Sequence, residues 1–473
     1  MRPHLPAASL TLMLQRDDEN QPGQRSTRVR VTVVSFLCVL SFLTYYDRQC
    51  IVRAQEDIQS SLGLADWQMA RVLSAFWLAY ALFEIPGGWM GDRIGARFTL
   101  TRIVLAWSLF TALTGVATGF YSLLIYRLLF GVGEAGAYPN MARVQSRWLP
   151  TVERARAGGV LWLSARWGAA FAPLLFGAIT RWIEAWQATL AKGSALEGLA
   201  AIPSWRIGFF ASGLLGVIWC AAFFVWFRDE PAQKGSVSPA ELRHIEAGRG
   251  PMEASHRMDR AVWRKLFSSP SLWAMALYYI CGSFGWSFFM SWMPRYMKDV
   301  HGVAFEKSEW SSAWPLVCGG VACLVGGVLS DALVKRTGWR RLGRAVFPIG
   351  GCLIAAAAML AIPHVRSQRD ATILMCVAAA AFDLGQAANW ASIVDMGGRY
   401  AGVAMGFINM VGNLGNSAQP VIGERVFNTL GWNALFVVYA VAFLLAMTMW
   451  TIIDPTRRFY DEREAKSESK PSA

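Results

Sequence analysis

The sequence contains few charged residues for its length. Only 16% of the 473 residues are Asp, Glu, Lys or Arg, whereas soluble domains contain about 25%. Apolar residues make up 54% of the chain, and the mean hydropathy is +0.33. This composition excludes an ordinary soluble domain and predicts a protein of the lipid bilayer. The 22 Trp agree with that prediction, because Trp is enriched where membrane helices meet water.

Residue patterns typical of metal binding and catalysis are also missing. The five histidines lie outside the apolar runs, and the eight cysteines lie inside them without a CxxC pair. We therefore expect no metal site, no cofactor and no disulfide framework. The sequence shows no nucleophile–base motif and no glycine-rich phosphate loop, so we do not expect an enzyme. The net charge of +13 comes from cations in particular loops, which indicates membrane orientation rather than a nucleic-acid partner.

Long apolar stretches divide the chain into membrane-spanning segments. A helix needs about 20 apolar residues to cross the hydrocarbon core, and such stretches recur along the chain. The sequence therefore predicts an all-α membrane protein with twelve transmembrane helices. We place these helices at residues 31–54, 69–91, 98–119, 121–142, 156–182, 206–227, 270–297, 309–333, 344–363, 370–394, 400–424 and 431–453.

Lys and Arg are distributed unequally between the two sets of predicted loops. If the N-terminus lies inside the cell, 31 of them face the cytoplasm and 11 face the other side. Cytoplasmic loops of membrane proteins carry such an excess of positive charge. We therefore expect a multi-pass protein of the plasma (inner) membrane with both termini in the cytoplasm.

The two halves of the chain repeat each other. GGWMGDRIGARF at 87–98 follows the second predicted helix, and GGVLSDALVKRTGWRR at 326–341 follows the eighth. Asp92 and Asp331 in these segments are 239 residues apart, which is also the offset between the starts of the first and seventh helices. A six-helix unit duplicated in parallel occurs in secondary transporters. We expect a cytosolic tail (1–30), a first six-helix half (31–228), a cytosolic central loop (229–269), a second six-helix half (270–453) and a cytosolic C-terminal tail (454–473).

Five ionisable residues interrupt the predicted helices. Asp47 and Arg48 are adjacent in the first helix, Arg127 and Glu134 lie two turns apart in the fourth, and Arg166 lies in the fifth. A charge at mid-membrane costs about 2.5–3.5 kcal/mol even on the lenient insertion scale. One explanation is a structural network of ion pairs. We favour the other, binding of protons and an anion, in which a carboxylate carries the proton because no histidine lies inside the apolar runs.

The segment after the second helix resembles the signature loop of the major facilitator superfamily. The matching residues are Gly88, Asp92, Arg93, Gly95 and Arg97, with Asp331 at the equivalent place in the second half. The resemblance implies a gating loop whose acid faces a helix end and whose cations pair across the two halves in one state. It also implies the major facilitator fold, with two halves of six helices each around a central cavity.

Further motifs resemble one family within that superfamily. The Asp-Arg pair at 47–48, RxxxGxxE at 127–134, IPGGWxxDR at 85–93 and the stretch 383–416 are together similar to the anion:cation symporter family. That family includes bacterial sugar-acid (hexuronate) permeases and the vesicular glutamate and sialic-acid transporters. The resemblance implies that Asp47 and Glu134 carry protons and that Arg127 modulates Asp47. It implies that the anion contacts Arg48, Tyr80, Asn389, Trp390 and Asn409.

Two positions depart from the family pattern. Arg166 and Glu84 stand where sugar-acid permeases often have Gln. With Glu84 and Asp383 left aside, three arginines face two acids within the helices, which favours an anionic substrate. Guanidinium groups bind carboxylates through two hydrogen bonds, so we also assign Arg166 to substrate binding. For Asp383 two interpretations stay open, a proton carrier of the second half or a hydrogen-bonded cap at a helix kink.

These features together predict a secondary active transporter. The leading prediction is proton-coupled import of an organic anion, a sugar acid such as a hexuronate, aldonate or aldarate, by alternating access. An anion exporter or exchanger is the alternative within transport. A transporter-like sensor is disfavoured, because the central loop has only about 40 residues and no long soluble domain is present. We expect a monomer whose partners are a small organic anion, protons and the lipid bilayer.

Overall fold

The regular structure of the chain is helical, as predicted. The computed structural model describes residues 26–190, 197–248, 260–303, 305–397 and 401–460, and no strand occurs among them. Most of the predicted tails and part of the central loop therefore lie outside the described residues.

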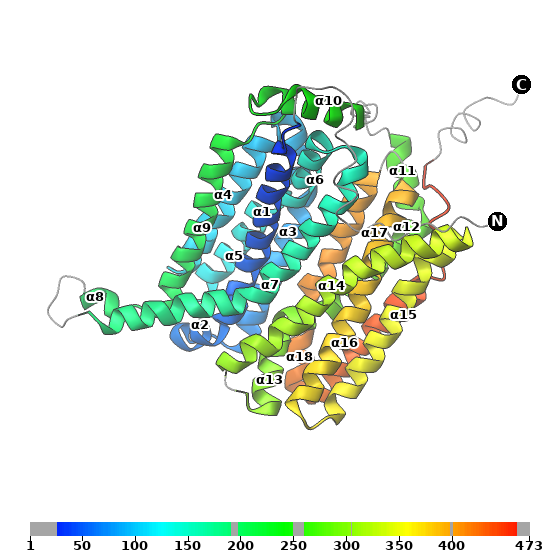
Figure 1. Ribbon diagram of the computed structural model, residues 1–473. Coiled ribbons are helices and arrows are strands. Elements are labelled where there is room, and N and C mark those ends of the chain that lie inside the picture. Colours follow the sequence, from blue (N-terminus) through cyan, green and yellow to red (C-terminus); the bar gives the residue numbers. More distant parts are fainter. Residues whose placement is uncertain (1–25, 191–196, 249–259, 304, 398–400, 461–473) are drawn as a thin grey trace, which may run out of the picture.

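The membrane passages of the first half are formed by long apolar helices. The fourth passage consists of two shorter helices, α5 and α6, which are separated by Ala135 and Gly136. The passages are α1 (Val29–Arg53), α3 (Asp66–Ile94), α4 (Ala96–Thr114), α5 (Phe120–Glu134) with α6 (Ala137–Trp148), α7 (Thr151–Ala188) and α9 (Ser204–Trp226). Two short helices, α2 (Gln55–Leu62) and α8 (Glu197–Ala200), lie at one end of this group (Figure 1).

The second half has the same number of passages. It comprises α12 (Pro270–Ser287) continued by the π-helical turn η2 (Phe288–Trp292) and α13 (Met293–His301), then α14 (Phe305–Thr337), α15 (Arg340–Ala361), α16 (Gln368–Leu384) with α17 (Gln386–Gly397), and α18 (Ala401–Met449). The last helix contains two passages, because Gly431 interrupts it with φ 76°. By length and apolar character alone, ten helices of the described residues can cross a membrane. Counting α5 with α6 as one further passage and α18 as two gives the predicted twelve.

Glycines allow the break in the fourth passage to pack closely against α3. Gly136 has φ +87°, which favours glycine, and a Cβ atom on Gly87 of α3 would lie 2.5 Å from the carbonyl oxygen of Ala135. Asn140 ties the junction together by donating hydrogen bonds to the carbonyl oxygens of Gly87 and Gly136, at 3.0 and 2.7 Å. This packing fixes the end of α5, where Glu134 is the last helical residue.

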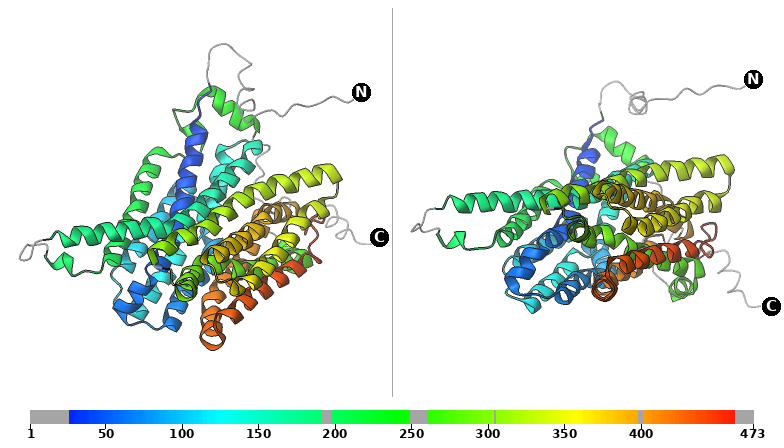
Figure 2. Two further views of the ribbon diagram at one scale, coloured as in Figure 1. Left: turned by 60° about the horizontal axis from the view of Figure 1, so that its bottom comes forward. Right: turned by 90° about the horizontal axis from the view of Figure 1, so that it is seen from below.

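The helices of the two halves form two neighbouring groups. In Figure 1 the blue to green helices α1 to α9 lie on one side and the yellow to red helices α14 to α18 on the other, and Figure 2 shows the same division from two more directions. The groups meet where α3 packs on α18 and where α7 packs on α14. Three of the candidate residues, Tyr80 and Asn409 at the first contact and Arg166 at the second, belong to helices that form these contacts.

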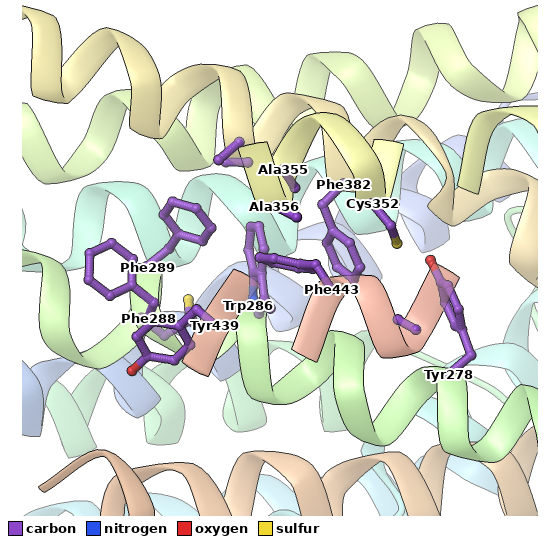
Figure 3. Packing of buried hydrophobic residues seen from close by; sticks show 14 of the residues in the cluster. Tyr278, Trp286, Phe288, Phe289, Cys352, Ala355, Ala356, Phe382, Tyr439 and Phe443 are labelled. Atoms are coloured by element: carbon purple, nitrogen blue, oxygen red, sulfur yellow. The ribbon is translucent and has the colours of Figure 1, made fainter. Parts of the chain in front are cut away.

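Aromatic side chains fill the core of the second half. Trp286 packs on Phe289 and Phe382, with ring centroids 5.5 and 6.4 Å apart, and Figure 3 shows these rings between the surrounding helices. Phe382 also packs on Phe443 of α18, at 5.1 Å. The core therefore holds α12, α16 and α18 together and sets the position of Asp383, the residue after Phe382.

Part of the central loop is fastened to the first half. Helix α10 (Pro239–Gly248) lies across the end of the molecule opposite α2 and α13 (Figure 1). The buried carboxylate of Glu241 accepts hydrogen bonds from the backbone N–H groups of Val29 and Arg30, at 3.1 and 3.0 Å. These groups lie in the first turn of α1 and have no partner inside the helix. Glu241 therefore caps α1 from a distant part of the chain.

Candidate functional site

A buried ion pair joins the first and fourth passages. Arg48 Nε donates a hydrogen bond to Glu134 Oε1 at 2.7 Å, and Arg48 Nη2 lies 2.5 Å from the same oxygen. Both side chains are almost fully buried. The sequence analysis singled out both residues but assigned Arg48 to the anion. In this structure Glu134 is the acid that Arg48 binds.

Four aromatic rings surround the Arg48 guanidinium. Its Cζ lies 4.6 Å from the ring centre of Tyr80, 4.8 Å from Tyr45, 5.0 Å from Trp77 and 5.3 Å from Phe76. Cation–π attraction of this kind strengthens when water is excluded. The cage gives the cation contacts besides its acidic partner, and the predicted substrate residue Tyr80 is one of them.

Asp47 and Arg127 lie beside this pair. Both are buried, and Asp47 is within electrostatic range of Glu134 and Arg127. The guanidinium of Arg127 lies over Phe130 and Phe76, with its Cζ 4.6 and 5.1 Å from the ring centres. Asp47 Oδ1 has no hydrogen-bond partner. The predicted proton-coupling residues are thus gathered in one buried cluster of the first half.

A second buried ion pair crosses between the halves. Arg166 Nη2 of α7 donates to Asp383 Oδ1 of α16 at 2.8 Å, and the side chains are 13% and 0% exposed. The Arg166 guanidinium also lies 3.9 Å above the ring of Trp286. Asp383 therefore bonds to a side chain of the other half, and the two interpretations left open for it stay predictions. The sequence analysis left Asp383 aside when it counted charges.

Glu84 also joins the two halves. Asn409 Nδ2 of α18 donates to Glu84 Oε1 of α3 at 2.5 Å, and Glu84 is buried. The other oxygen of Glu84 has no hydrogen-bond partner. With Glu84 and Asp383 included, four buried carboxyl groups face three arginines. The predicted surplus of positive charge is therefore wrong for the fully ionised site.

The two substrate residues predicted on the tenth passage lie in different surroundings. Asn389 is fully buried and donates to the Tyr278 hydroxyl at 2.8 Å within the second half. Trp390 instead reaches the other half, where its ring lies 5.4 Å from that of Trp162. Trp162 stacks in turn on Tyr138 at 5.0 Å. A row of rings thus spans the two halves on the α10 side of the two arginine pairs.

Ion pairs also lie at the opposite end, near α2 and α13. Arg295 Nη2 of α13 is 3.0 Å from Asp66 Oδ2 of α3, and Lys298 Nζ is 2.6 Å from Glu56 Oε2 of α2. Both pairs join the second half to the first. A pocket of about 280 Å³ lies beside them, and its lining also includes Glu424. The sequence analysis did not single out the four residues of these two ion pairs.

The contacts that the structure describes for the predicted gating loop do not join the two halves. Arg97 donates to the Phe224 carbonyl oxygen of α9, with its Nε at 2.9 Å, and its backbone N–H donates to Asp229 at 3.0 Å. Arg93 lies over Trp89, and the side chain of Asp92 lies outside the described part of the structure.

Gly88 and Gly95 serve packing and the turn of this loop. A Cβ atom on Gly88 would meet Pro139 at 3.2 Å, and Gly95 has φ +89°. In the second half Asp331 pairs with Arg344 at 2.8 Å. Pairing of the loop cations across the halves in another state stays a prediction.

The geometry described so far, two helical groups with buried ion pairs between and within them, matches a known family. The sequence matches the Major Facilitator Superfamily model over residues 37–420, which is most of the chain. The chain belongs to the major facilitator superfamily. Members are membrane transporters, so this major facilitator protein is a multi-pass transporter and not an enzyme.

Curated relatives extend over nearly the whole chain. A probable sulfoacetate transporter, SauU of Cupriavidus necator, is 30% identical over 451 residues, covering 93% of this chain and 98% of the relative. The D-galactonate transporter of Escherichia coli is 29% identical, with the same coverage. The hexuronate transporter of Bacillus subtilis is 27% identical and covers 88% of this chain and 91% of its own length. The resemblance to bacterial sugar-acid permeases is thereby confirmed.

A solved structure supports the fold. A bacterial homologue of the human lysosomal transporter Spinster, in an inward-facing and unoccupied conformation, superposes with a TM-score of 0.69. It is 22% identical and covers 95% of this chain and 100% of its own. The major facilitator fold predicted from the repeat and the signature loop is therefore confirmed.

Proposed function

We propose that this transporter imports an organic anion together with protons, and that a sugar acid is the substrate. The buried Arg48–Glu134 pair, with Asp47 and Arg127 beside it, carries the proposal. Removing one charge from a buried pair leaves the other uncompensated, which costs about 3–5 kcal/mol. A proton on Glu134 therefore favours a state in which Arg48 has a new anionic partner.

The charge count links the proton to the substrate. Three arginines and four carboxyl groups give the fully ionised site an excess of one negative charge, which repels an anion. Protonation of one acid makes the site neutral, and protonation of two makes it positive. Anion binding and proton binding then favour the same state, and this mutual preference is the coupling free energy.

Substrate contacts follow from the same residues. We assign the acidic group to Arg48 and Arg166, since guanidinium groups bind carboxylates through two hydrogen bonds. Hydroxyl groups on the substrate suit Tyr80, Asn389 and Asn409, and Trp390 offers an apolar face. Relatives named for galactonate and hexuronate transport support a polyhydroxylated acid.

The proposed direction follows from the predicted orientation. With both termini in the cytoplasm of a bacterial inner membrane, the α2–α13 end faces outward. The ion pairs at this end then hold the outer side closed, and their separation opens the site to external substrate. Rocking of the two halves in this way is alternating access.

A thermal-shift screen of the purified transporter tests the substrate class. A ligand at 100 times its Kd stabilises the fold by about 2.7 kcal/mol. We expect hexuronates, aldonates or aldarates to raise the melting temperature and the corresponding neutral sugars to leave it unchanged. Stabilisation by a neutral sugar but by none of the acids would contradict the proposal.

A further inference from the structure

We propose that Arg166 and Asp383 form a second charged subsite that receives the second acidic group of a dianionic substrate. Asp383 holds Arg166 while the site is empty, and the substrate's acid takes the place of Asp383. This inference rests on the proposed function and narrows its substrate class from organic anions to dianions. It adds a role for Asp383, which the resemblance to known permeases does not supply.

The contact with Asp383 leaves N–H groups of Arg166 available for hydrogen bonds to a ligand. Arg166 uses Nη2 for the bond to Asp383 Oδ1, whereas a guanidinium carries five N–H donors in a planar fork. None of the Arg166 nitrogen atoms is among the buried atoms without a hydrogen-bond partner, whereas Arg127 Nε is. Arg166 is also the more exposed arginine of the two ion pairs. A ligand can therefore reach the remaining N–H groups.

The surroundings hold the Arg166 guanidinium in place, but they leave one carboxylate oxygen of Asp383 without a hydrogen bond. Trp286 supports the flat face of Arg166 at 3.9 Å, and its own ring is fixed in the core by Phe289 and Phe382 (Figure 3). Asp383 Oδ2 is buried without a hydrogen-bond partner, and a Cβ atom on Gly319 would overlap it. A carboxylate with one unsatisfied oxygen is a weaker partner than an acid that binds the fork with both oxygens.

The position of Asp383 matches that of Glu134 in the other half. Glu134 is the last residue of α5 and lies two residues before Gly136, where the fourth passage breaks. Asp383 lies two residues before Gly385, where the tenth passage breaks between α16 and α17. Each acid binds an arginine from another passage, within one half for Glu134 and across the halves for Asp383. The chain thus has one arginine–acid pair at each of two equivalent helix breaks.

The two arginines lie close to the same tyrosines. Arg48 lies 4.8 Å from the ring centre of Tyr45, and Tyr45 is also within electrostatic range of Arg166. Tyr138 likewise interacts electrostatically with both arginines. On this inference a small molecule with an acid at each end contacts both guanidiniums, whereas a monoanion occupies one of them.

Calorimetric binding to the full chain in lipid nanodiscs tests the inference with matched pairs of probes. D-glucarate is compared with D-gluconate, and sulfoacetate with 2-hydroxyethanesulfonate, since the members of each pair differ only in the second acidic group. The wild-type chain should bind at least one dianion more tightly than its monoanionic partner. Arg166→Gln should weaken dianion binding by about 10- to 150-fold, the loss of one charge-assisted hydrogen bond, and weaken monoanion binding less.

Asp383→Asn distinguishes a replaceable partner from a structural bridge. If Asp383 competes with the substrate for Arg166, this variant binds the dianion more tightly than wild type, opposite in sign to Arg166→Gln. A structural bridge predicts weaker binding of both probes in both variants, and that result would overturn the inference. Wild-type binding of monoanions without preference for dianions would also overturn it and leave the proposed function intact. Binding of no anion at all would overturn both.

A double variant keeps the test valid if a single variant fails to fold. Arg166→Gln combined with Asp383→Asn removes both charges, so that neither member of this pair is left as an unpaired buried charge. It should still bind the monoanion, and it should bind the dianion like Arg166→Gln alone. Dianion binding at the wild-type level in the double variant would show that Arg166 does not contact the second acid.

Discussion

Arg48 of α1 and Glu134 of α5 form a buried pair in which Arg48 Nε donates to Glu134 Oε1 over 2.7 Å. The aromatic cage around Arg48 belongs to the same half, so we expect this cation to keep its place when Glu134 is protonated. A proton on Glu134 therefore changes the partner of Arg48 rather than its position. This relationship is the physical basis of the coupling proposed above.

Neutralising the two acids of this cluster should uncouple transport from protons. Glu134→Gln and Asp47→Asn should each abolish accumulation driven by a pH gradient, because neither side chain can then release a proton. Exchange of substrate without a gradient should survive in at least one of them. The control is Asp370→Asn in the exposed first turn of α16, which should accumulate substrate like wild type. Full proton-driven accumulation by both acid variants would disprove the assignment.

The outer ion pairs should control which side of the transporter is open. Arg295→Asp or Asp66→Arg removes one contact between the halves. A partly exposed ion pair contributes about 0.2–1 kcal/mol, so each change should shift the open-to-closed ratio by up to about fivefold. Spin labels at exposed Ser60 and Val300, in a chain without native cysteines, report the distance between the halves at this end.

Exchanging both charges supplies the control for that experiment. The double variant Asp66→Arg with Arg295→Asp restores an ion pair and should return the distance distribution toward wild type. Distances that are unchanged in both single variants would mean that this pair does not contribute to closure.

The orientation predicted from Lys and Arg can be tested directly. Reporter fusions after residues 230 and 455 should both give cytoplasmic signals, since cytoplasmic loops carry the excess of positive charge. A periplasmic signal at either position would contradict the topology and would invert the proposed outer and inner ends.

Glu241 should hold α10 against the first half. Its carboxylate caps α1 through the backbone N–H groups of Val29 and Arg30, and loss of such a cap costs about 0.5–2 kcal/mol. Glu241→Ala should therefore raise trypsin cleavage between α9 and α12 by about 2- to 30-fold. Glu246→Ala changes an exposed acid of the same helix and should leave cleavage unchanged. Equal cleavage of both variants would show that the cap does not hold α10.

Much of the fold could be predicted because the signals are local. Twenty-residue apolar runs define the passages, and the repeat of the Asp92 and Asp331 segments defines the two halves. The acids at membrane depth were visible for the same reason, since a charge inside an apolar run is costly wherever it occurs.

The partners of the buried charges could not be predicted from local signals. Pairing depends on how helices rotate and pack, and Glu84 and Asn409 are 325 residues apart in the chain. The sequence analysis left Asp383 aside and assigned Arg166 to the substrate, whereas Arg166 binds Asp383 in this structure. The sequence analysis considered a kink at Asp383 but not the break after Glu134, which also places an acid at the end of a half-helix.

Uptake of labelled sugar acids into proteoliposomes of the purified transporter tests the central claim most directly. An acidic exterior and a neutral lumen should drive accumulation of at least one hexuronate, aldonate or aldarate above the external concentration, and a protonophore should abolish it. Accumulation that is equal with and without the pH gradient would contradict proton coupling. Transport of a neutral sugar in place of every acid tested would contradict the account of an organic-anion importer.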